Sequence, residues 1–271
     1  MESKKIKDSY YMGSIRIDSN TKHFYITNNF IFEAEPPTIV VFIEQEELRT
    51  YKMKANPWRN WMNKNPELII AKRTGLPINH LKTTRNSNIN KEEDRNLVNL
   101  YSYVIDEFDS QHVITMSIVS DWHYRLFNGI YPFAGNYRTV DMQKGKDSTA
   151  MTWLLRFLDN IPELDNLLNS LSKASNLSIK DLTFKISEFI CEFLFIHPYR
   201  EGNGRLSRLV ADYFLVKNGF PPIGANLTVD PSAYIEKLHI GYKQKDYEPL
   251  SGLITEKVEK AILLFEKRNT H

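Results

Sequence analysis

The chain has 271 residues, enough for one good-sized domain with an appendage or for two small domains. Hydrophobic residues make up 42% of it, charged residues 25% and aromatic residues 12%, a composition that excludes a largely disordered chain and favours a well-packed core. The net charge of +2 excludes a strongly basic surface overall, although a local patch can still bind phosphate.

The cysteine content and the short apolar runs bear on the cellular compartment of the protein. Cys191 is the only cysteine, so no intramolecular disulfide can form and a reducing compartment is the simplest expectation. It lies in the apolar stretch FICEFLFI, which favours a buried structural thiol over a nucleophile. No apolar segment follows the charged N-terminus, and the longest aliphatic runs, such as Ile39–Ile43, are too short to span a bilayer. We therefore expect a cytoplasmic protein that does not bind membranes.

Residues 1–56 are predicted to form a small β region. Between residues 12 and 53, apolar residues alternate with polar ones or occur in short runs, as strands require. The pair Asn28-Asn29 suits a hairpin turn. The pattern indicates three or four strands.

Residues 57–91 are predicted to form a short helical connector. Pro57 suits the first turn of a helix, and a second helix is predicted from Pro66 to Arg73. The polar residues 83–91 predict a linker or an exposed loop.

Residues 92–271 are predicted to form a mostly helical domain. The spacing of apolar residues predicts helices over 92–108, 114–127, 150–159, 179–196, 204–218, 231–244 and 249–267. Residues 131–150 lack that spacing and are predicted to be irregular or β. The expected fold class is therefore mainly α, with a small N-terminal β-containing region.

A polar run, HPYREGNGRLSR, lies between two of these apolar helices and extends from His197 to Arg208. Pro198 disfavours helical geometry at His197, so the first helix should end there. Gly202 and Gly204 permit backbone geometry that is closed to other residues. A second helix that starts near Gly204 directs N–H groups and the positive end of its dipole into the loop, which makes the loop an anion site.

The charged residues of the run suit the chemistry of a nucleotide polyphosphate. Arg205 and Arg208 are three apart and hence on one helix face, and guanidinium groups suit phosphate oxygens. Glu201 would repel bare phosphate, but it suits Mg²⁺, which bridges carboxylates and phosphates. His197 titrates near neutrality and is the obvious general base. Each residue alone is more often a turn, a helix end or a solvated face, whereas their combination in one loop is hard to explain as packing.

The same run resembles the signature of the Fic family, His-x-Phe-x-Asp/Glu-Gly-Asn-Gly-Arg-x-x-Arg, at every position except Tyr199, where the family has Phe. Similarity extends from about Glu92 to Ile262. It includes the stretch YPFAGNYR, from Tyr131 to Arg138, which resembles the segment that leads into the family's target-docking β-hairpin flap. The resemblance implies a Fic-type helical catalytic domain over residues 92–271 that carries such a flap.

The resemblance also implies transfer of AMP from ATP to a Ser, Thr or Tyr hydroxyl of a target protein. His197 would deprotonate that hydroxyl, and Glu201 would bind Mg²⁺. ATP and its phosphates would be bound by Arg200, Gly202, Asn203, Gly204, Arg205 and Arg208. The flap would include Thr139, Val140, Asp141, Met142, Gln143, Lys144 and Gly145.

Two departures from the family pattern bear on packing and regulation. Tyr199 keeps the aromatic anchor but adds a hydroxyl that needs a partner. Many members carry an inhibitory helix whose Glu pairs with the second signature Arg. Thr255 and Glu259 have the spacing of that helix, but Lys260 follows, so an idle surface pair or a separate inhibitory, antitoxin-like protein are alternatives. A homodimer is also compatible with the sequence.

Other functions remain open at this level. Removal of AMP from targets would use the same loop. Ala71, Gly75 and Leu81 have the spacing of a helix-turn-helix over residues 66–85, so a nucleotide-sensing regulator that binds nucleic acid is a second hypothesis, although a short helix–turn packed on the catalytic domain is favoured. Residues 145–148 lack the upstream Gly and the Ser/Thr of a P-loop, and no Cys/His cluster suggests zinc.

Overall fold

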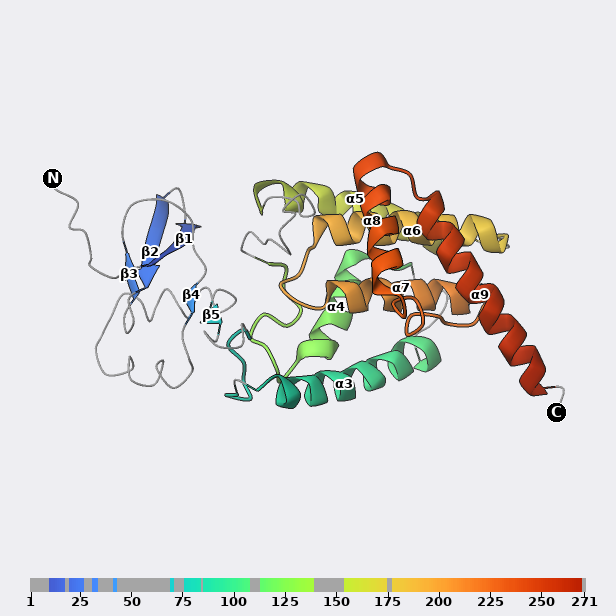
Figure 1. Cartoon of the computed structure of the whole chain (residues 1–271), viewed down its shortest axis with the longest axis horizontal. Helices are drawn as coiled ribbons and strands as arrows, with labels where there is room; N and C mark the ends of the chain where they lie inside the picture. The colour runs from blue at the N-terminus through green and yellow to red at the C-terminus, as the bar shows by residue number, and fades with distance from the viewer. Residues whose placement is uncertain are drawn as a thin grey trace. The chain divides into compact units, whose positions relative to one another are not determined.

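The computed structural model describes residues 10–17, 20–26, 31–33, 41–42, 69–70, 76–83, 85–107, 113–138, 154–174 and 177–269. The chain forms two compact units. One contains residues 1–94 and 128–133, and the other contains residues 95–127 and 134–271. The first unit carries the short strands, and the second carries most of the helices (Figure 1).

The strands of the N-terminal unit are β1 (Tyr10–Ile17), β2 (Asn20–Ile26), β3 (Ile31–Glu33), β4 (Val41–Phe42) and β5 (Ile69–Ile70). β1, β2 and β3 form an antiparallel sheet in that order, and β4 pairs in parallel with β5. The prediction of a small β region is confirmed for these residues. The predicted hairpin turn at Asn28-Asn29 and the helix expected from Pro57 lie outside the described residues.

Two predictions for residues 66–85 are wrong. A helix is expected from Pro66 to Arg73, but Ile69 and Ile70 form strand β5, because these two β-branched residues pair with β4. The described residues between 76 and 85 contain no helix and include a turn at His80. A helix-turn-helix needs two helices in this stretch, so that alternative is wrong for the described part of it.

The loop predicted over residues 83–91 is wrong from residue 86 onward, because helix α3 (Asn86–Ser102) begins there. The Thr83 hydroxyl oxygen accepts from the Arg85 N–H at 3.1 Å and from the Asn88 side chain at 3.3 Å. Short polar side chains here bond to groups at the start of α3 and lead into a helix instead of a loop.

The remaining helical elements follow the predicted order. They are a π-helical turn, η3 (Tyr103–Glu107), and then α4 (Met116–Phe127), α5 (Leu154–Lys173), α6 (Ile179–Ile196), α7 (Asn203–Lys217), α8 (Pro231–Gln244) and α9 (Glu248–Asn269). The fold is therefore mainly α, as the periodicity predicts. Within the described ranges, no helix is both long enough and apolar enough to cross a membrane.

Helix α5 is longer than predicted. The sequence predicts a helix over 150–159, but α5 continues through Pro162 to residue 173. Leu164, Leu168 and Leu171 are each at most 1% exposed and recur at helical spacing on one face. Burial of that face outweighs the loss of one backbone donor at Pro162.

Helix α6 is the central helix of the second unit and packs against α5, α7, α8 and α9 (Figure 1). Its buried apolar residues recur every three to four positions: Leu182, Ile186, Phe189, Ile190, Phe193 and Ile196. Cys191 is a buried free thiol, as predicted, and burial raises its pKa to about 12. Because neighbours hold α6 on several sides, the loop that follows its C-terminus starts from a fixed position.

Candidate functional site

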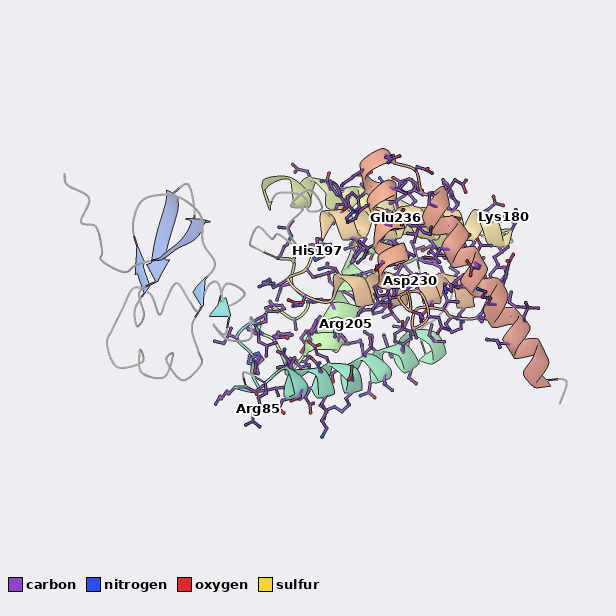
Figure 2. The ribbon with its side chains drawn as sticks, in the orientation of Figure 1. Arg85, Lys180, His197, Arg205, Asp230 and Glu236 are labelled. Carbon is purple, nitrogen blue, oxygen red and sulfur yellow. The ribbon has the colours of Figure 1, made fainter. Side chains whose placement is uncertain are left out.

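The polar loop begins where the sequence predicts. α6 ends at Ile196, and His197 follows as its C-cap in the left-handed conformation, with a φ of 53°. The His197 N–H donates to the Phe193 carbonyl at 2.9 Å, so the backbone geometry at the helix end is defined. Figure 2 shows His197 at this end of α6, opposite the end that carries Lys180. Pro198 follows directly and prevents the helix from continuing.

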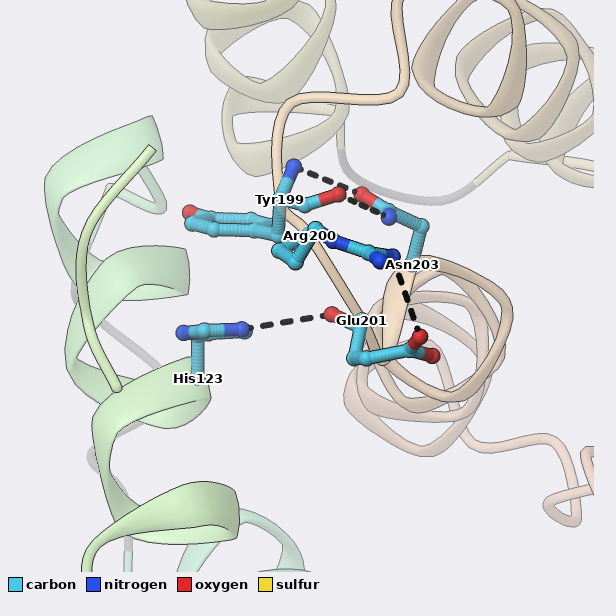
Figure 3. Close-up of polar contacts among 5 residues, drawn as sticks. All are labelled: His123, Tyr199, Arg200, Glu201 and Asn203. Carbon is cyan, nitrogen blue, oxygen red and sulfur yellow. Dashed lines mark hydrogen bonds and ion pairs between the residues drawn. The ribbon is translucent and has the colours of Figure 1, made fainter. Parts of the chain in front are cut away.

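The Asn203 side chain closes the loop. Its Oδ1 accepts from the Tyr199 N–H at 3.0 Å, and its Nδ2 donates to the Tyr199 carbonyl at 2.7 Å (Figure 3). Asn203 is 2% exposed, so both bonds are shielded from competing water. The side chain of Asn203 therefore braces the loop, while its backbone opens helix α7.

The hydrogen-bond partner of the His197 ring indicates which ring nitrogen carries the hydrogen. Nδ1 lies 3.2 Å from the Leu194 carbonyl oxygen. Because a carbonyl only accepts, Nδ1 carries the hydrogen of the neutral ring and Nε2 carries the lone pair. The side chain is largely buried yet lies in the loop and not in the core of α6. This is the tautomer that a general base acting through Nε2 requires.

Gly202 opens helix α7 with a φ of 83°, and no side chain caps this helix start. A Cβ atom at Gly202 would overlap the Phe127 ring. Both the backbone conformation and the space therefore require glycine here. The first-turn N–H groups of α7 and the positive end of its dipole are directed at the loop, an arrangement that binds anions.

Arg205 and Arg208 line one cavity, as their spacing predicts. The cavity has a volume of about 440 Å³ and lies between α3, α7 and the segment 222–228. The Arg205 guanidinium carbon lies 5.1 Å from the centre of the Phe127 ring, a cation–π distance. Two guanidinium groups on one wall, next to the start of α7, suit the oxygens of a polyphosphate.

A buried carboxylate shapes the same cavity. Asp212 accepts from the N–H groups of Ile223 at 2.7 Å and of Gly224 at 2.8 Å, and from the Tyr101 hydroxyl at 3.0 Å. Burial raises the pKa of Asp212, and these three bonds counteract that shift. Asp212 therefore fixes residues 223–224 against α7. Sequence reasoning missed this residue, because its partners follow a helix end and are not adjacent to it.

Glu201 lies in the loop, and its side chain is accessible. Its side chain is 41% exposed, and its Oε1 lies 3.4 Å from Nη1 of Arg200 (Figure 3). Among the described residues, no group of three or more His, Cys, Asp or Glu could hold a metal ion. Mg²⁺ commonly takes one or two carboxylates together with substrate phosphates and water. A single accessible carboxylate beside an anion site fits that ion as a partner of a bound nucleotide.

Tyr199 replaces the Phe of the signature, and the hydroxyl that it adds has a hydrogen-bond partner. Its hydroxyl lies 2.7 Å from the Ser120 Oγ on α4, and the residue is fully buried. Its ring stacks on the His123 ring at a centroid distance of 4.2 Å (Figure 3). The aromatic anchor of the loop is therefore held against α4 by both packing and a hydrogen bond.

Arg138 holds the end of α6, a role that sequence reasoning missed. Its Nε donates to the His197 carbonyl at 2.7 Å, its Nη2 to the Ile196 carbonyl at 3.3 Å, and its N–H to the Pro198 carbonyl at 2.8 Å. The side chain is 1% exposed. A cation at a helix C-terminus satisfies the last carbonyls and complements the dipole. The sequence feature that could have pointed to Arg138 is its position at the end of the stretch YPFAGNYR.

His123 also contacts the loop and was missed. It lies in α4, fully buried, with Nδ1 2.7 Å from the Gly135 nitrogen and Nε2 3.2 Å from the Glu201 carbonyl oxygen. Burial lowers its pKa to about 3, with a smaller contribution in the same direction from the positive charge of Arg205. In the sequence it is one polar position of an amphipathic helix, and nothing local marks it.

The candidate inhibitory residues lie away from the loop. The Thr255 hydroxyl lies 2.7 Å from that of Thr183, in the second turn of α6. Glu259 lines a groove of about 710 Å³ with Lys180, whereas Arg208 lines the cavity described above. In this part of the chain, Glu259 and Arg208 form no ion pair with each other.

The predicted flap, residues 139–145, lies outside the described residues. The segment that leads to it, residues 134–138, is described and lies against the loop through Arg138. A role for Thr139–Gly145 in target docking therefore stays a prediction.

Comparisons with known proteins agree with this geometry. Residues 113–215 match the model of the Fic/DOC family. The protein adenylyltransferase fic-1 of Caenorhabditis briggsae is 27% identical over 131 residues, which cover 48% of this chain and 24% of that protein. The fic-1 protein of Caenorhabditis elegans is also 27% identical, over 130 residues. The match spans about a quarter of the length of these curated relatives.

Solved structures share the fold. The type IV secretion system effector BepA superposes with a TM-score of 0.61 at 17% identity, over 74% of this chain and 72% of BepA. BepC of Bartonella tribocorum, solved with bound AMPPNP, superposes with a TM-score of 0.58 at 15% identity, over 69% of this chain and 94% of BepC. The signature loop between α6 and α7 lies within residues 113–215, the part of the chain that matches the Fic/DOC family model.

Proposed function

We propose that this chain is a protein adenylyltransferase that moves AMP from ATP to a Ser, Thr or Tyr hydroxyl of a target protein, with residues 92–271 as its catalytic domain. The observation that carries the proposal is the His197 ring, whose Nδ1 is held by the Leu194 carbonyl so that Nε2 carries the lone pair. The same loop ends in the uncapped, glycine-opened N-terminus of α7. A base and an anion site therefore share one braced loop.

In the proposed reaction, Nε2 of His197 accepts the proton of the target hydroxyl. The hydroxyl oxygen bonds to the α-phosphorus of ATP, and the bond from that phosphorus to the bridging oxygen of the β-phosphate breaks. AMP stays on the target, and pyrophosphate leaves with the electron pair of the broken bond. The N–H groups at the start of α7 bind the α-phosphate oxygens, and Arg205 and Arg208 bind the departing phosphates.

Mg²⁺ belongs to this proposal as a partner of the nucleotide. Glu201 would hold it, because its carboxylate is accessible and next to the anion site. When bound, Mg²⁺ offsets negative charge on the phosphates. The Arg200 guanidinium lies within ion-pair distance of the Glu201 carboxylate and holds it close to the anion site. A cytoplasmic setting is part of the same proposal, and the buried free thiol of Cys191 supports it.

The test compares two labelled forms of ATP. The full chain is incubated with a cell lysate and Mg²⁺, with ATP labelled on either the α- or the γ-phosphate, and the labelled proteins are identified by mass spectrometry. We expect label on protein from the α-phosphate alone, with a mass gain of one AMP on a hydroxyl side chain. Label from the γ-phosphate would indicate phosphorylation and contradict the proposal.

Two variants control this experiment. His197→Ala removes the proposed base, and His80→Ala removes an exposed histidine that lies outside the loop. Only the first should abolish labelling. Addition of fresh enzyme without ATP to the purified labelled product then measures the reverse activity, and rapid loss of AMP would indicate that removal, not transfer, is the main activity.

A further inference from the structure

His123 links two segments that meet at the catalytic loop. It lies in the second half of α4, is fully buried, stacks on the Tyr199 ring and packs at a tilt against the Phe127 ring. Its ring centroid is 4.2 Å from that of Tyr199 at an interplanar angle of 12°, and 4.9 Å from that of Phe127. The Phe127 ring is also the one that a side chain at Gly202 would strike. The imidazole is thus held in place by the same packing that holds the loop.

Both ring nitrogens have backbone partners of opposite kind. The Gly135 N–H points to Nδ1 at 2.7 Å, and an N–H can only donate, so Nδ1 accepts. The Glu201 carbonyl oxygen lies 3.2 Å from Nε2, and a carbonyl can only accept, so Nε2 donates (Figure 3). One neutral tautomer satisfies both bonds at once. No other uncharged side chain of this size offers an acceptor and a donor at these two positions.

The Glu201 peptide is therefore fixed from α4. Its carbonyl is tied to His123, and Tyr199, two residues earlier, is tied to Ser120 on the same helix. The loop is thus held from one side by α4 and from within by Asn203. A backbone held at Glu201 limits the positions that its carboxylate can reach, which is how outer partners orient a metal ligand.

We propose that His123 is a positioning residue for adenylyl transfer, which holds the Glu201 backbone through Nε2 so that the Glu201 carboxylate is placed for the Mg²⁺–nucleotide complex. This inference rests on the proposed function. His123 itself touches neither nucleotide nor target. Its bond to Gly135 serves a separate purpose, which is to hold the segment 134–138 that carries Arg138.

Two substitutions separate the two bonds. The amide of Asn ends near the position of Nδ1, so His123→Asn keeps an acceptor for Gly135 and loses the donor to Glu201. The amide of Gln ends near the position of Nε2, so His123→Gln keeps the donor to Glu201 and loses the acceptor for Gly135. The pair is matched, because each variant removes one buried hydrogen bond of the same ring.

The measurement is the affinity of the full chain for a non-hydrolysable ATP analogue, by calorimetry, with Mg²⁺ and with EDTA. The ratio of the two affinities is the Mg²⁺ enhancement. We expect His123→Asn to lose about tenfold of that enhancement, the lower end of the effect of losing an outer partner of a metal ligand. We expect His123→Gln to show the same Mg²⁺ enhancement as the wild type. Glu201→Gln gives the value for a lost metal ligand.

The outcomes are distinguishable. Equal enhancement in wild type and His123→Asn, or equal loss in both His123 variants, overturns the positioning role and leaves the proposed function intact. No Mg²⁺ enhancement in wild type overturns the metal role of Glu201 and this inference with it. Nitrogen-15 NMR of the wild-type histidines provides a check that needs no variant, since it reports the tautomer. A hydrogen on Nδ1 of His123 instead of Nε2 overturns the inference even if both variants fail to fold.

Discussion

The region around His197 and the region around His123 hold the same side chain in opposite ways. His197 follows α6 in a loop, and its Nδ1 donates to the Leu194 carbonyl. His123 lies inside α4, and its Nδ1 accepts from the Gly135 N–H. The hydrogen therefore lies on Nδ1 in the first ring and on Nε2 in the second. In the proposed reaction the Nε2 lone pair of the first ring accepts a proton, whereas the second ring uses both nitrogens to hold backbone.

Backbone partners, more than residue type, therefore decide what each of these two histidines does. Both rings are within the second compact unit, and both contact backbone groups at or near the loop. The N–H and C=O groups that face the two rings differ, and these groups set the position of the hydrogen. Substitutions at these two regions should therefore change different measured quantities: the rate of transfer in one case and the stability or placement of the loop in the other.

The largest expected effect is on catalysis at His197. His197→Ala should lower the transfer rate by about 10²–10⁴, the usual effect of losing a general base. The fold should remain, because His197 lies beyond the end of α6. Labelling kinetics with α-labelled ATP measure the rate, and circular dichroism checks the fold. A variant that labels targets at the wild-type rate would remove the proposed difference between the two histidines.

The next largest effect is expected on stability at Gly202, the N-cap of α7. Gly202→Ala should destabilise the protein by about 1–3 kcal/mol beyond the backbone cost, because the new methyl would overlap Phe127, which packs on His123. Gly219→Ala is the matched control. Gly219 has a φ of 82° against 83° for Gly202, but no atom lies within 4 Å of its added Cβ. Chemical denaturation of both variants isolates the steric contribution, and equal losses would show that Phe127 yields to the methyl.

The burial of His123 predicts a pH dependence of stability. The pKa of His123 is about 3 in the folded protein against 6.5 as the reference value. Between these values the unfolded chain binds a proton that the folded chain does not, so the free energy of unfolding falls as the pH falls below about 6.5. The slope from this residue is at most about 1.4 kcal/mol per pH unit.

Urea denaturation of wild type and His123→Gln at several pH values from 7 to 4.5 measures this slope. The Gln side chain does not titrate, so its curve should be flatter over that window, and the difference between the curves belongs to His123. Parallel curves would mean that His123 is protonated in the folded state, and that the contrast with His197 in hydrogen-bond roles is wrong.

A smaller effect is expected at Tyr199. Tyr199→Phe removes the hydroxyl that lies 2.7 Å from Ser120, so stability should fall by about 0.5–1.5 kcal/mol. The ring and its stacking on His123 remain, so the transfer rate should change little. A double-mutant cycle with Ser120→Ala checks the assignment. Additive losses in that cycle would show that the hydroxyl does not couple the loop to α4.

The smallest effect is expected at Glu259. The structure places Glu259 in a groove with Lys180 and not beside Arg208, so Glu259→Gln should leave self-labelling unchanged and stability within about 0.5 kcal/mol. A tenfold rise in self-labelling would instead show that α9 restrains the enzyme through this residue, since losing a charge-assisted contact of about 1.5–3 kcal/mol has an effect of that size. Without a rise, restraint requires a separate inhibitory protein or does not occur.

Local sequence patterns predict most helices of residues 92–271 and the loop that joins α6 to α7. The predicted ranges 179–196 and 231–244 coincide with α6 and α8. The end of α6 before Pro198 was likewise predicted, and α7 begins at Asn203, one residue before the predicted start near Gly204. Periodicity, a proline and a helix-opening glycine act within a few residues, so a linear pattern carries them. The signature loop, with its base and its arginines, is local in the same sense.

The side chains that hold that loop come from residues that are distant in sequence and meet it through packing. His123 lies 78 residues before Glu201, and Arg138 lies 59 residues before His197, so no local pattern joins them. The strand at Ile69–Ile70, predicted as helix, depends on β4 as its partner, and α5 passes through Pro162 because its leucines are buried. Hydrogen bonds and burial depend on which elements pack together, so a local pattern does not identify the partner of a residue that is distant in sequence.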